Sequence, residues 1–329
     1  MRVFGGNNLA GKEKRKYMSR REEMTARLTA LPANVQGALW LLLSAVLFVV
    51  MAVLVKYLGQ TFDPFQISFF RQLFQIIVIL PFLIRAGGAE GGIRTKVLPL
   101  QMLRGFVGSS AMICGFYAFA HLPLADAQAL NFSRTLFLVP LAALLLSEPI
   151  GKRRVIAALV GFGGVLIMLR PTGALDPAAL VALLGAALVA LATVLVKIAS
   201  RYDQPITLMF YTGVGGLIVT SVPAYLVWIM PSWEQLALLA IMGSAGAASH
   251  NCFIRGYRVG EATVIAPFEY SRLIFLALAG IVIFGDIPTI WTLAGAAVII
   301  GAALYIVRRE SQAAREARAA EKAVERLPE

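Results

Sequence analysis

Two stretches of the chain, AVLFVVMAVLVKYL at 45–58 and AALVALATVLVKIA at 186–199, are close copies of each other. Each is an apolar run with one lysine near its end, and a proline follows each at the same spacing, Pro64 after the first and Pro205 after the second. Apolar runs of this kind predict helices that cross a membrane, because a backbone in lipid must satisfy its own hydrogen bonds. The similarity indicates an internal duplication.

Residue pairs separated by 138 positions extend the duplication towards the C-terminus. Apolar segments match one another easily by chance, so pairs with polar members carry the argument. If each copy has five spans, an odd number, the second copy enters the membrane from the opposite side, as in transporters built from inverted repeats. We therefore expect an all-α integral membrane protein of ten transmembrane helices in two inverted five-helix repeats. The pairs are Cys114 and Cys252, Ser133 and Ser271, Arg134 and Arg272, Glu148 and Asp286, and Arg170 and Arg308.

The composition agrees with a chain that lies mostly in lipid. Of the 329 residues, 59% are hydrophobic and 15% are charged, whereas a soluble domain has about 25% charged residues. Only short connections remain between the apolar runs, which leaves no room for a water-soluble catalytic domain. The spans are predicted near 36–57, 66–84, 98–119, 124–146, 153–170, 178–197, 205–228, 234–254, 261–283 and 289–307.

Lysine and arginine are concentrated in the two tails and in alternate loops. Because cytoplasmic loops retain positive charge, this distribution predicts an inner (plasma) membrane protein with both termini in the cytoplasm. It also accounts for the net charge of +12 without a nucleic-acid partner, which would need a basic face on a soluble fold. The predicted organisation is a basic tail at 1–35, a first repeat at 36–170, a second repeat at 177–307 and a charged helix or tail at 308–329.

Several segments resemble the drug/metabolite transporter superfamily, in particular its ten-span EamA-type branch. They are Arg71 after Asp63-Pro64, Arg104-Gly105, LSEPIGKR at 146–153, APFEYSRLIFLALAG at 266–280 and IFGD at 283–286. The resemblance covers about 36–307 and implies a small-metabolite carrier of the inner membrane, with a central cavity lined mainly by spans one, three, four, six, eight and nine. Within the branch, the chain is similar to S-adenosylmethionine and riboflavin uptake proteins and to amino-acid and drug exporters.

Charged side chains deep in the spans are the strongest candidates for substrate contact, because a charge in lipid is costly and usually faces a cavity or a partner. Arg134 lies about ten residues into span four with Asn131 one turn away. Arg272 is equally deep in span nine, one turn after Glu269. Either arginine could bind an anionic group of the substrate, since a guanidinium matches carboxylate or phosphate. The structural alternative is that Glu269 and Arg272 pair within their own helix.

Two titratable residues are candidates for coupling transport to protons. Glu269 is a carboxylate clearly deep in a span, and its proton affinity could change as a cavity opens. If Glu269 is permanently paired with Arg272, that coupling fails. His250, near the end of span eight, is the second candidate, against the alternative of a hydrogen-bonded structural histidine.

Aromatic and further basic residues complete the candidate set. Tyr117, Phe132 and Tyr270 could stack on a flat substrate ring, although aromatic residues in spans are mostly packing or interfacial anchors. Arg71 and Arg104 lie closer to span ends, which favours a structural or gating role over substrate contact.

Prolines in two spans suggest hinges. Pro140 in span four and Pro267 in span nine can kink their helices and free carbonyl groups towards a cavity. Simple shape-fitting of the bundle is the alternative use of each proline.

The sequence argues against catalysis, since it contains no HExxH, no G-x-S-x-G and no Walker-type phosphate loop. We therefore expect a non-enzymatic secondary transporter of a small zwitterionic or anionic metabolite, resembling an amino acid, S-adenosylmethionine or a flavin, with no cofactor and no metal site. An exporter of drugs or amino acids with a mainly aromatic cavity is the alternative within transport, and a non-transporting scaffold or sensor is the alternative outside it. The expected partners are the substrate and the lipid bilayer. The oligomeric state is not determined, and a monomer is compatible with the sequence.

Overall fold

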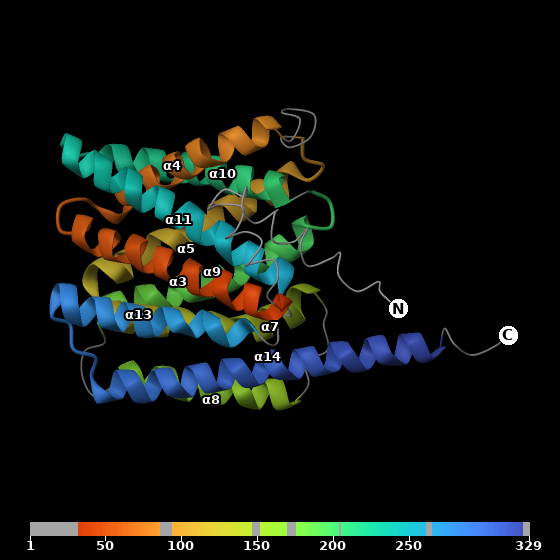
Figure 1. Ribbon diagram of the computed structural model, residues 1–329. Helices are drawn as coiled ribbons and strands as arrows, with labels where there is room; N and C mark the ends of the chain where they lie inside the picture. Colours follow the sequence, from red (N-terminus) through yellow and green to blue (C-terminus); the bar gives the residue numbers. More distant parts are fainter. Residues whose placement is uncertain are drawn as a thin grey trace, which may run out of the picture.

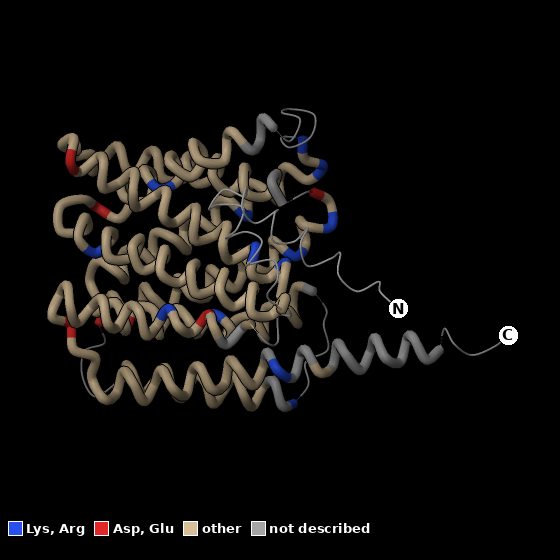
Figure 2. Tube along the Cα trace, in the orientation of Figure 1, with Lys and Arg blue, Asp and Glu red and all other residues tan. Residues whose placement is uncertain are grey.

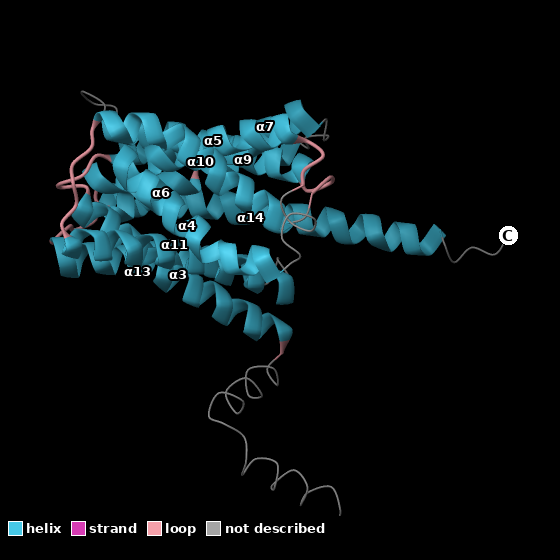
Figure 3. Ribbon diagram, turned by 90° about the horizontal axis from the view of Figure 1, so that it is seen from above, coloured by secondary structure: helices cyan, strands magenta, loops and turns pink. Residues whose placement is uncertain are grey.

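The computed structural model describes residues 32–85, 94–146, 152–169, 176–203, 205–260 and 265–324. Every regular element in these ranges is a helix, and the helices lie side by side in one bundle (Figure 1). A view turned by 90° shows the same arrangement, with the last helix projecting beyond the bundle (Figure 3). The elements are α3 (Ala33–Leu58), α4 (Pro64–Arg85), α5 (Leu98–His121), α6 (Leu124–Phe132), α7 (Arg134–Leu146), α8 (Lys152–Leu169), α9 (Pro177–Ala199), α10 (Pro205–Leu226), α11 (Trp233–Val259), the 3₁₀ helix η2 (Ala266–Tyr270), α13 (Ser271–Ala279), the π-helical η3 (Gly280–Phe284) and α14 (Ile290–Val324).

Seven helical segments of the described residues are long and apolar enough to cross a membrane. They correspond to predicted spans one to four and six to eight. Two further apolar helices, at 155–169 and 290–306, are shorter, and the ninth predicted span is divided among η2, α13 and η3. The chain is therefore a multi-pass membrane protein, while the count of ten spans stays a prediction.

Local sequence signals explain where several helices begin. Asp176 caps α9 by accepting a hydrogen bond from the backbone N–H of Ala178 at 2.8 Å, and Pro177 occupies the first turn, where no N–H partner is needed. Ser232 and Gln235 form a reciprocal capping box at the start of α11. These caps satisfy backbone N–H donors at the N-termini of α9 and α11.

Close backbone approach holds neighbouring helices together at glycines. A Cβ built on Gly105 of α5 would lie 3.0 Å from the Cα of Gly215 in α10. A Cβ on Gly164 of α8 would lie 2.8 Å from the carbonyl oxygen of Gly295 in α14. Side chains at these positions would push the helices apart, so small residues provide the tight packing that helices in lipid require.

The most extensive helix contacts join the two halves of the chain. Helix α3 packs on α11, α5 on α9, α4 on α10 and α8 on α14. Fully buried side chains lie between these helices, whereas large apolar side chains on the outside are highly exposed, for example Val282 at 80% and Leu144 at 78%. An apolar exterior is what a lipid-embedded bundle presents.

Charged residues gather at the two ends of the bundle, and few lie between them (Figure 2). Helix α14 continues without a break through the predicted charged segment as far as Val324. The predicted N-terminal tail up to residue 31, Glu148, Arg170 and residues 325–329 lie outside the described residues.

Candidate functional site

Two helix interruptions occur at matching places in the two halves of the chain. Helix α6 ends at Phe132 and α7 begins at Arg134, so Ser133 separates them. In the second half, η2 ends at Tyr270 and α13 begins at Ser271. Each serine hydroxyl donates a hydrogen bond of 2.6 Å to the carbonyl three residues earlier, a contact that competes with the regular helical pattern. An arginine follows each serine directly.

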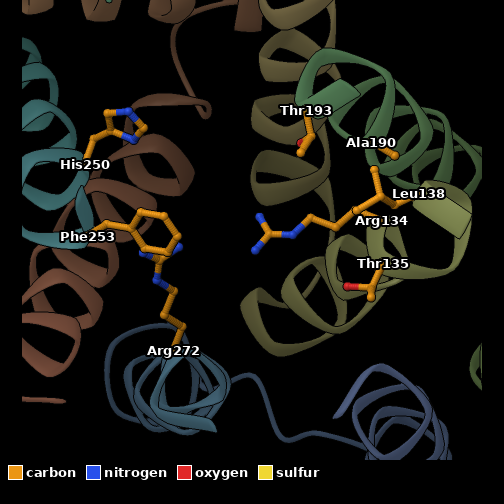
Figure 4. Close-up of a pocket in the computed structure, with 8 residues that line it drawn as sticks. All are labelled: Arg134, Thr135, Leu138, Ala190, Thr193, His250, Phe253 and Arg272. Atoms are coloured by element: carbon orange, nitrogen blue, oxygen red, sulfur yellow. The ribbon is translucent and has the colours of Figure 1, made fainter. Parts of the chain in front are cut away.

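These two arginines line the same cavity, which has a volume of about 370 Å³. The side chain of Arg134 enters from α7, and that of Arg272 rises from α13 on the other side (Figure 4). His250 and Phe253 of α11 form the wall next to Arg272. The remaining lining residues are Thr135, Leu138, Ala190 and Thr193.

Arg134 forms an ion pair that connects the two halves of the chain. Its Nη2 lies 3.1 Å from Oε2 of Glu269, and the two side chains are 31% and 15% exposed. The hydroxyl of Tyr257 donates to Oε1 of the same carboxylate. Both oxygens of Glu269 are therefore engaged, and the charge of Arg134 has a partner.

Arg272 has a different environment. Its Nη2 donates to Oγ of Ser44 at 2.9 Å, and its guanidinium lies over the rings of Phe48 and Phe253, at 4.7 and 5.5 Å from the ring centroids. Its Nε is buried and makes no hydrogen bond. No carboxylate of the described residues pairs with Arg272, so the pairing with Glu269 within one helix, the structural alternative, is not formed.

A pair of serines positions the partner of Arg272. The hydroxyl of Ser44 donates to the carbonyl of Ser249, and the hydroxyl of Ser249 donates to the carbonyl of Ser44, both at 2.8 Å. These reciprocal bonds join α3 to α11 in the buried interior. They fix Ser44 where it accepts from Arg272.

His250 lies farther from the end of its helix than the sequence suggested. The predicted span eight ended at residue 254, but α11 continues to Val259, so His250 is more than two turns from the helix end. The His250 ring lines the cavity, with its centroid 6.4 Å from that of Phe253.

The predicted aromatic and amide contacts lie outside the cavity lining. Tyr117 stacks on His121 with centroids 4.0 Å apart, and Phe132 packs against Tyr270 at 4.7 Å. Asn131 is half-buried and is not part of the lining.

Arg71 and Arg104 bind to groups on their own or neighbouring helices. Arg71 donates to Oε1 of Gln75 at 2.8 Å, while Arg104 donates to Oε1 of Gln101 at 3.2 Å and to the carbonyl of Leu208. Neither arginine lines the cavity. A structural or gating role for each arginine stays a prediction.

The two prolines differ in their relation to the helix interruptions. Helix α7 continues through Pro140, and the interruption lies earlier, at Ser133. Pro267 is in the first turn of η2 itself, where its missing N–H removes no helical hydrogen bond. A hinge at either proline stays a prediction.

Comparison with known proteins identifies the family. The model of the EamA-like transporter family matches residues 35–170 and 176–308. The chain belongs to the EamA-like transporter family. It is a membrane transporter of the drug/metabolite transporter superfamily, and its relatives are named as transporters, so its role is transport rather than catalysis.

Relatives of this EamA-type transporter carry different substrates. The chain is 32% identical to an S-adenosylmethionine uptake transporter of Rickettsia prowazekii, over 86% of this chain and 96% of the relative. It is 28% identical to a riboflavin transporter of Brucella anthropi, over 76% and 90%. A pseudopaline exporter of Pseudomonas aeruginosa is also 28% identical, over 83% and 96%.

A solved crystal structure shares the fold of this transporter. The two superpose with a TM-score of 0.56 and 18% sequence identity, over 82% of this chain and 95% of the other. At this identity the likeness concerns the fold alone.

The opposite end of the transporter contains a second ion pair between the halves. Lys56 at the end of α3 pairs with Asp286, which follows η3, and also donates to the carbonyl of Leu122 at 3.2 Å. Gly285 adopts a φ of 71°, a left-handed conformation that glycine tolerates without strain, and so turns the chain towards Lys56. Asp126 of α6 has a buried Oδ1 without a hydrogen bond.

Sequence reasoning missed several residues of the transporter site. Tyr257, Phe253 and Phe48 contact the charged groups, and Ser44 orients Arg272. Phe253 follows His250 by three residues and therefore shares its helix face, which is a signal that could have found it. The other three contacts depend on helix neighbours that the sequence alone does not specify.

The described residues contain no group of three or more histidine, cysteine, aspartate or glutamate side chains that could hold a metal ion. The expectation of no metal and no cofactor remains an expectation.

Proposed function

We propose that this protein is a secondary transporter that carries a small zwitterionic or anionic metabolite across the inner membrane by alternating access. One observation carries the proposal: two arginines at equivalent positions of the two halves line opposite sides of one cavity, and Arg272 lacks a carboxylate partner among the described residues. A buried guanidinium in a cavity favours binding of carboxylate or phosphate.

The alternating mechanism follows from ten spans in two inverted five-helix repeats. Helix packing supports this arrangement, because exchanging the two halves converts one interface into another. The α3–α11 interface corresponds to α9–α5, and the α13–α3 interface corresponds to α7–α9. Rocking of one repeat against the other around a central site would then expose the cavity to each side in turn.

The position of the cavity supports a state that faces the cytoplasm. His250, Phe253 and Thr193 lie in the C-terminal parts of α11 and α9, so the cavity is nearer the end where these helices finish. The extension of α14 projects from the same end of the bundle (Figure 1). At the other end, the ion pair of Lys56 and Asp286 joins the halves. The Lys and Arg distribution supports a cytoplasmic location for both termini and hence for the end of the bundle nearer the cavity.

The size of the cavity and the relatives together point to a compact substrate. Ligand pockets range from about 300 to 1,000 Å³, so a cavity of about 370 Å³ suits one amino-acid or nucleoside-like molecule. S-adenosylmethionine, the substrate named for the Rickettsia relative, carries an amino-acid group and is our first candidate. Riboflavin is the second.

Export is the alternative direction, supported by the pseudopaline exporter among the relatives. A drug exporter would have a mainly aromatic cavity with its arginines paired away. Besides the His250 ring, Phe253 is the aromatic residue in the lining. Arg272 is not paired with an acid of the described helices. These features favour a polar metabolite over a hydrophobic drug.

Glu269 is the coupling candidate because it holds the two halves together through Arg134. Coupling to protons requires this pair to separate during the cycle, so that the carboxylate can accept a proton. Substitution of Glu269 by Gln should flatten the pH dependence of uptake. An unchanged pH profile would point instead to His250 or to uncoupled exchange.

The test is uptake of radiolabelled S-adenosylmethionine into proteoliposomes, preceded by a thermal-shift screen against amino acids, S-adenosylmethionine, riboflavin and cationic dyes. A ligand that binds the folded state raises the melting temperature. We expect a shift with one chemical class, and we expect Arg134→Ala to lower flux when flux is expressed per amount of folded protein. Absence of shift and flux in folded protein would favour a scaffold or sensor.

A further inference from the structure

The two arginines of the cavity do not have equal access to a substrate anion. This step rests on the proposed function, because it divides roles within the same site. Arg134 shares its charge with Glu269 at 3.1 Å, and Tyr257 holds the other oxygen of that carboxylate. Nη2 of Arg134 therefore already donates to a protein carboxylate, and its positive charge is neutralised by Glu269.

Arg272 keeps donors that no acceptor of the described residues satisfies. A guanidinium has five N–H donors, and the hydroxyl of Ser44 accepts one of them at 2.9 Å. The rings of Phe48 and Phe253 cover the cation, but they offer no lone pair of the kind that an N–H donor needs. Nε remains buried without a partner. Nε and a terminal nitrogen can together donate two parallel hydrogen bonds to the oxygens of one carboxylate.

The charge balance around the cavity also favours an anion. Glu269 neutralises one arginine, and Arg272 adds a second positive charge. Arg71 adds a third beside α11, because its Nε lies 3.4 Å from the position that a Cβ on Gly246 would occupy, one turn before His250. In the described helices Arg71 also has no acidic partner, and its contacts are to glutamine side chains. The uncompensated field within this part of the bundle is positive.

We propose that Arg272, and not Arg134, binds the carboxylate of the transported metabolite. The aromatic rings and Ser44 hold the guanidinium in place before the substrate arrives, which lowers the ordering cost of binding. Arg134 is a positioning residue that keeps Glu269 joined to the first half. A planar carboxylate matches the two parallel donors of one guanidinium.

A pair of matched ligands tests this assignment. S-adenosylmethionine and its decarboxylated form differ only in the carboxylate, so the ratio of their dissociation constants measures what the carboxylate contributes. We expect the purified wild-type protein to bind S-adenosylmethionine about ten-fold more tightly than the decarboxylated form. In Arg272→Gln the two ligands should bind equally. Arg272→Lys keeps the charge without the planar fork and should give an intermediate ratio.

Arg134→Gln is the matched control on the other side of the cavity. It should weaken both ligands by a similar factor and leave their ratio near the wild-type value. A wild-type ratio in Arg272→Gln, or a ratio of one in Arg134→Gln, would overturn the assignment while leaving the proposed transporter function intact. If folded wild-type protein binds neither ligand, nor riboflavin nor any amino acid, and shows no flux, the proposed substrate class fails and the assignment fails with it.

Discussion

Arg134 and Arg272 occupy equivalent positions in the two halves of the chain, yet their surroundings differ. Both follow a serine at a helix interruption, and both reach the same cavity. Arg134 is paired with a carboxylate of the other half, whereas Arg272 donates a hydrogen bond to a hydroxyl and lies over two aromatic rings. A duplicated sequence pattern can therefore provide two identical side chains for two different tasks, one joining the halves and the other available to a ligand.

The largest effect is expected from making the two arginines alike. Glu269→Gln leaves Arg134 without a carboxylate, as Arg272 is now. Loss of one partner from a buried ion pair costs about 3–5 kcal/mol, and because Arg134 is 31% exposed we expect about 1–3 kcal/mol of folded-state stability to be lost. The melting temperature in detergent measures this loss. The double variant Arg134→Gln with Glu269→Gln should recover most of it, and a double variant no better than the single one would argue against the pair.

The second ion pair between the halves should behave differently from the first. Asp286→Asn removes the carboxylate partner of Lys56 and should cost about 1–2 kcal/mol, since both side chains are partly buried. The ratio of affinities for S-adenosylmethionine and its decarboxylated form should not change, because this pair is remote from the cavity. The charge exchange of Lys56→Asp with Asp286→Lys should restore stability relative to Asp286→Asn. A changed ligand ratio would mean that the two ends are not independent.

A smaller effect is expected from Ser44→Ala, which removes the hydroxyl that accepts from Arg272. We expect binding of S-adenosylmethionine to weaken two- to ten-fold, the range that corresponds to about 0.5–1.5 kcal/mol for one hydrogen bond. Isothermal titration calorimetry measures the change. Thr193→Val is the matched control, since Thr193 lines the cavity but bonds to its own helix, at Val189. An equal loss in both variants would indicate a general effect on the cavity.

The smallest effect is expected at Asp203, which lies near Arg104, an arginine that donates to Gln101 and to the carbonyl of Leu208. Gln101 connects Arg104 to Asp203, which also accepts from Thr95 and from the backbone of Lys96. Burial alone raises the pKa of Asp203, but these hydrogen bonds and the charge of Lys96 outweigh it, so the pKa lies below its ordinary value.

A carboxyl with a lowered pKa stabilises the fold above its unfolded pKa of about 3.9, and this contribution is lost as the pH falls through the folded pKa. Asp203→Asn should therefore lower the melting temperature slightly at pH 7 and reduce the fall in melting temperature between about pH 5 and pH 3. Ligand affinity should stay at the wild-type value. A loss of ligand affinity in this variant would mean that the region around Arg104 also influences ligand binding, as Arg272 is proposed to do.

The sequence predicted the helical membrane architecture well because lipid imposes a strong constraint. Any apolar run of sufficient length must form a helix in lipid, so the seven long spans follow from composition and length. The ninth predicted span is interrupted, and the interruption is less predictable because Pro267 can either kink a helix or begin a 3₁₀ turn. The positions of Arg134 and Arg272 within their predicted spans follow from the sequence, and their depth in the bilayer stays a prediction.

The partners of the charged residues were not predictable. Glu269 is one turn from Arg272 in sequence, which suggested a local pair, but its carboxylate turns to Arg134 and Tyr257 instead. Tyr117 looked equivalent to Tyr270 as a stacking residue, yet it packs on His121. Long side chains reach several neighbours within one turn, and the choice among them depends on which helices pack there.

Composition, the duplicated pattern and the polar residues within apolar runs determined by themselves that this chain is a multi-pass helical membrane protein with arginines inside its apolar runs. These properties come from the cost of exposing polar groups to lipid, which every span must meet on its own. Only the tertiary structure decided that Arg134 is neutralised and Arg272 is not. That difference depends on which carboxylate, hydroxyl and rings the packing of α3, α7, α11 and α13 brings within a few ångströms.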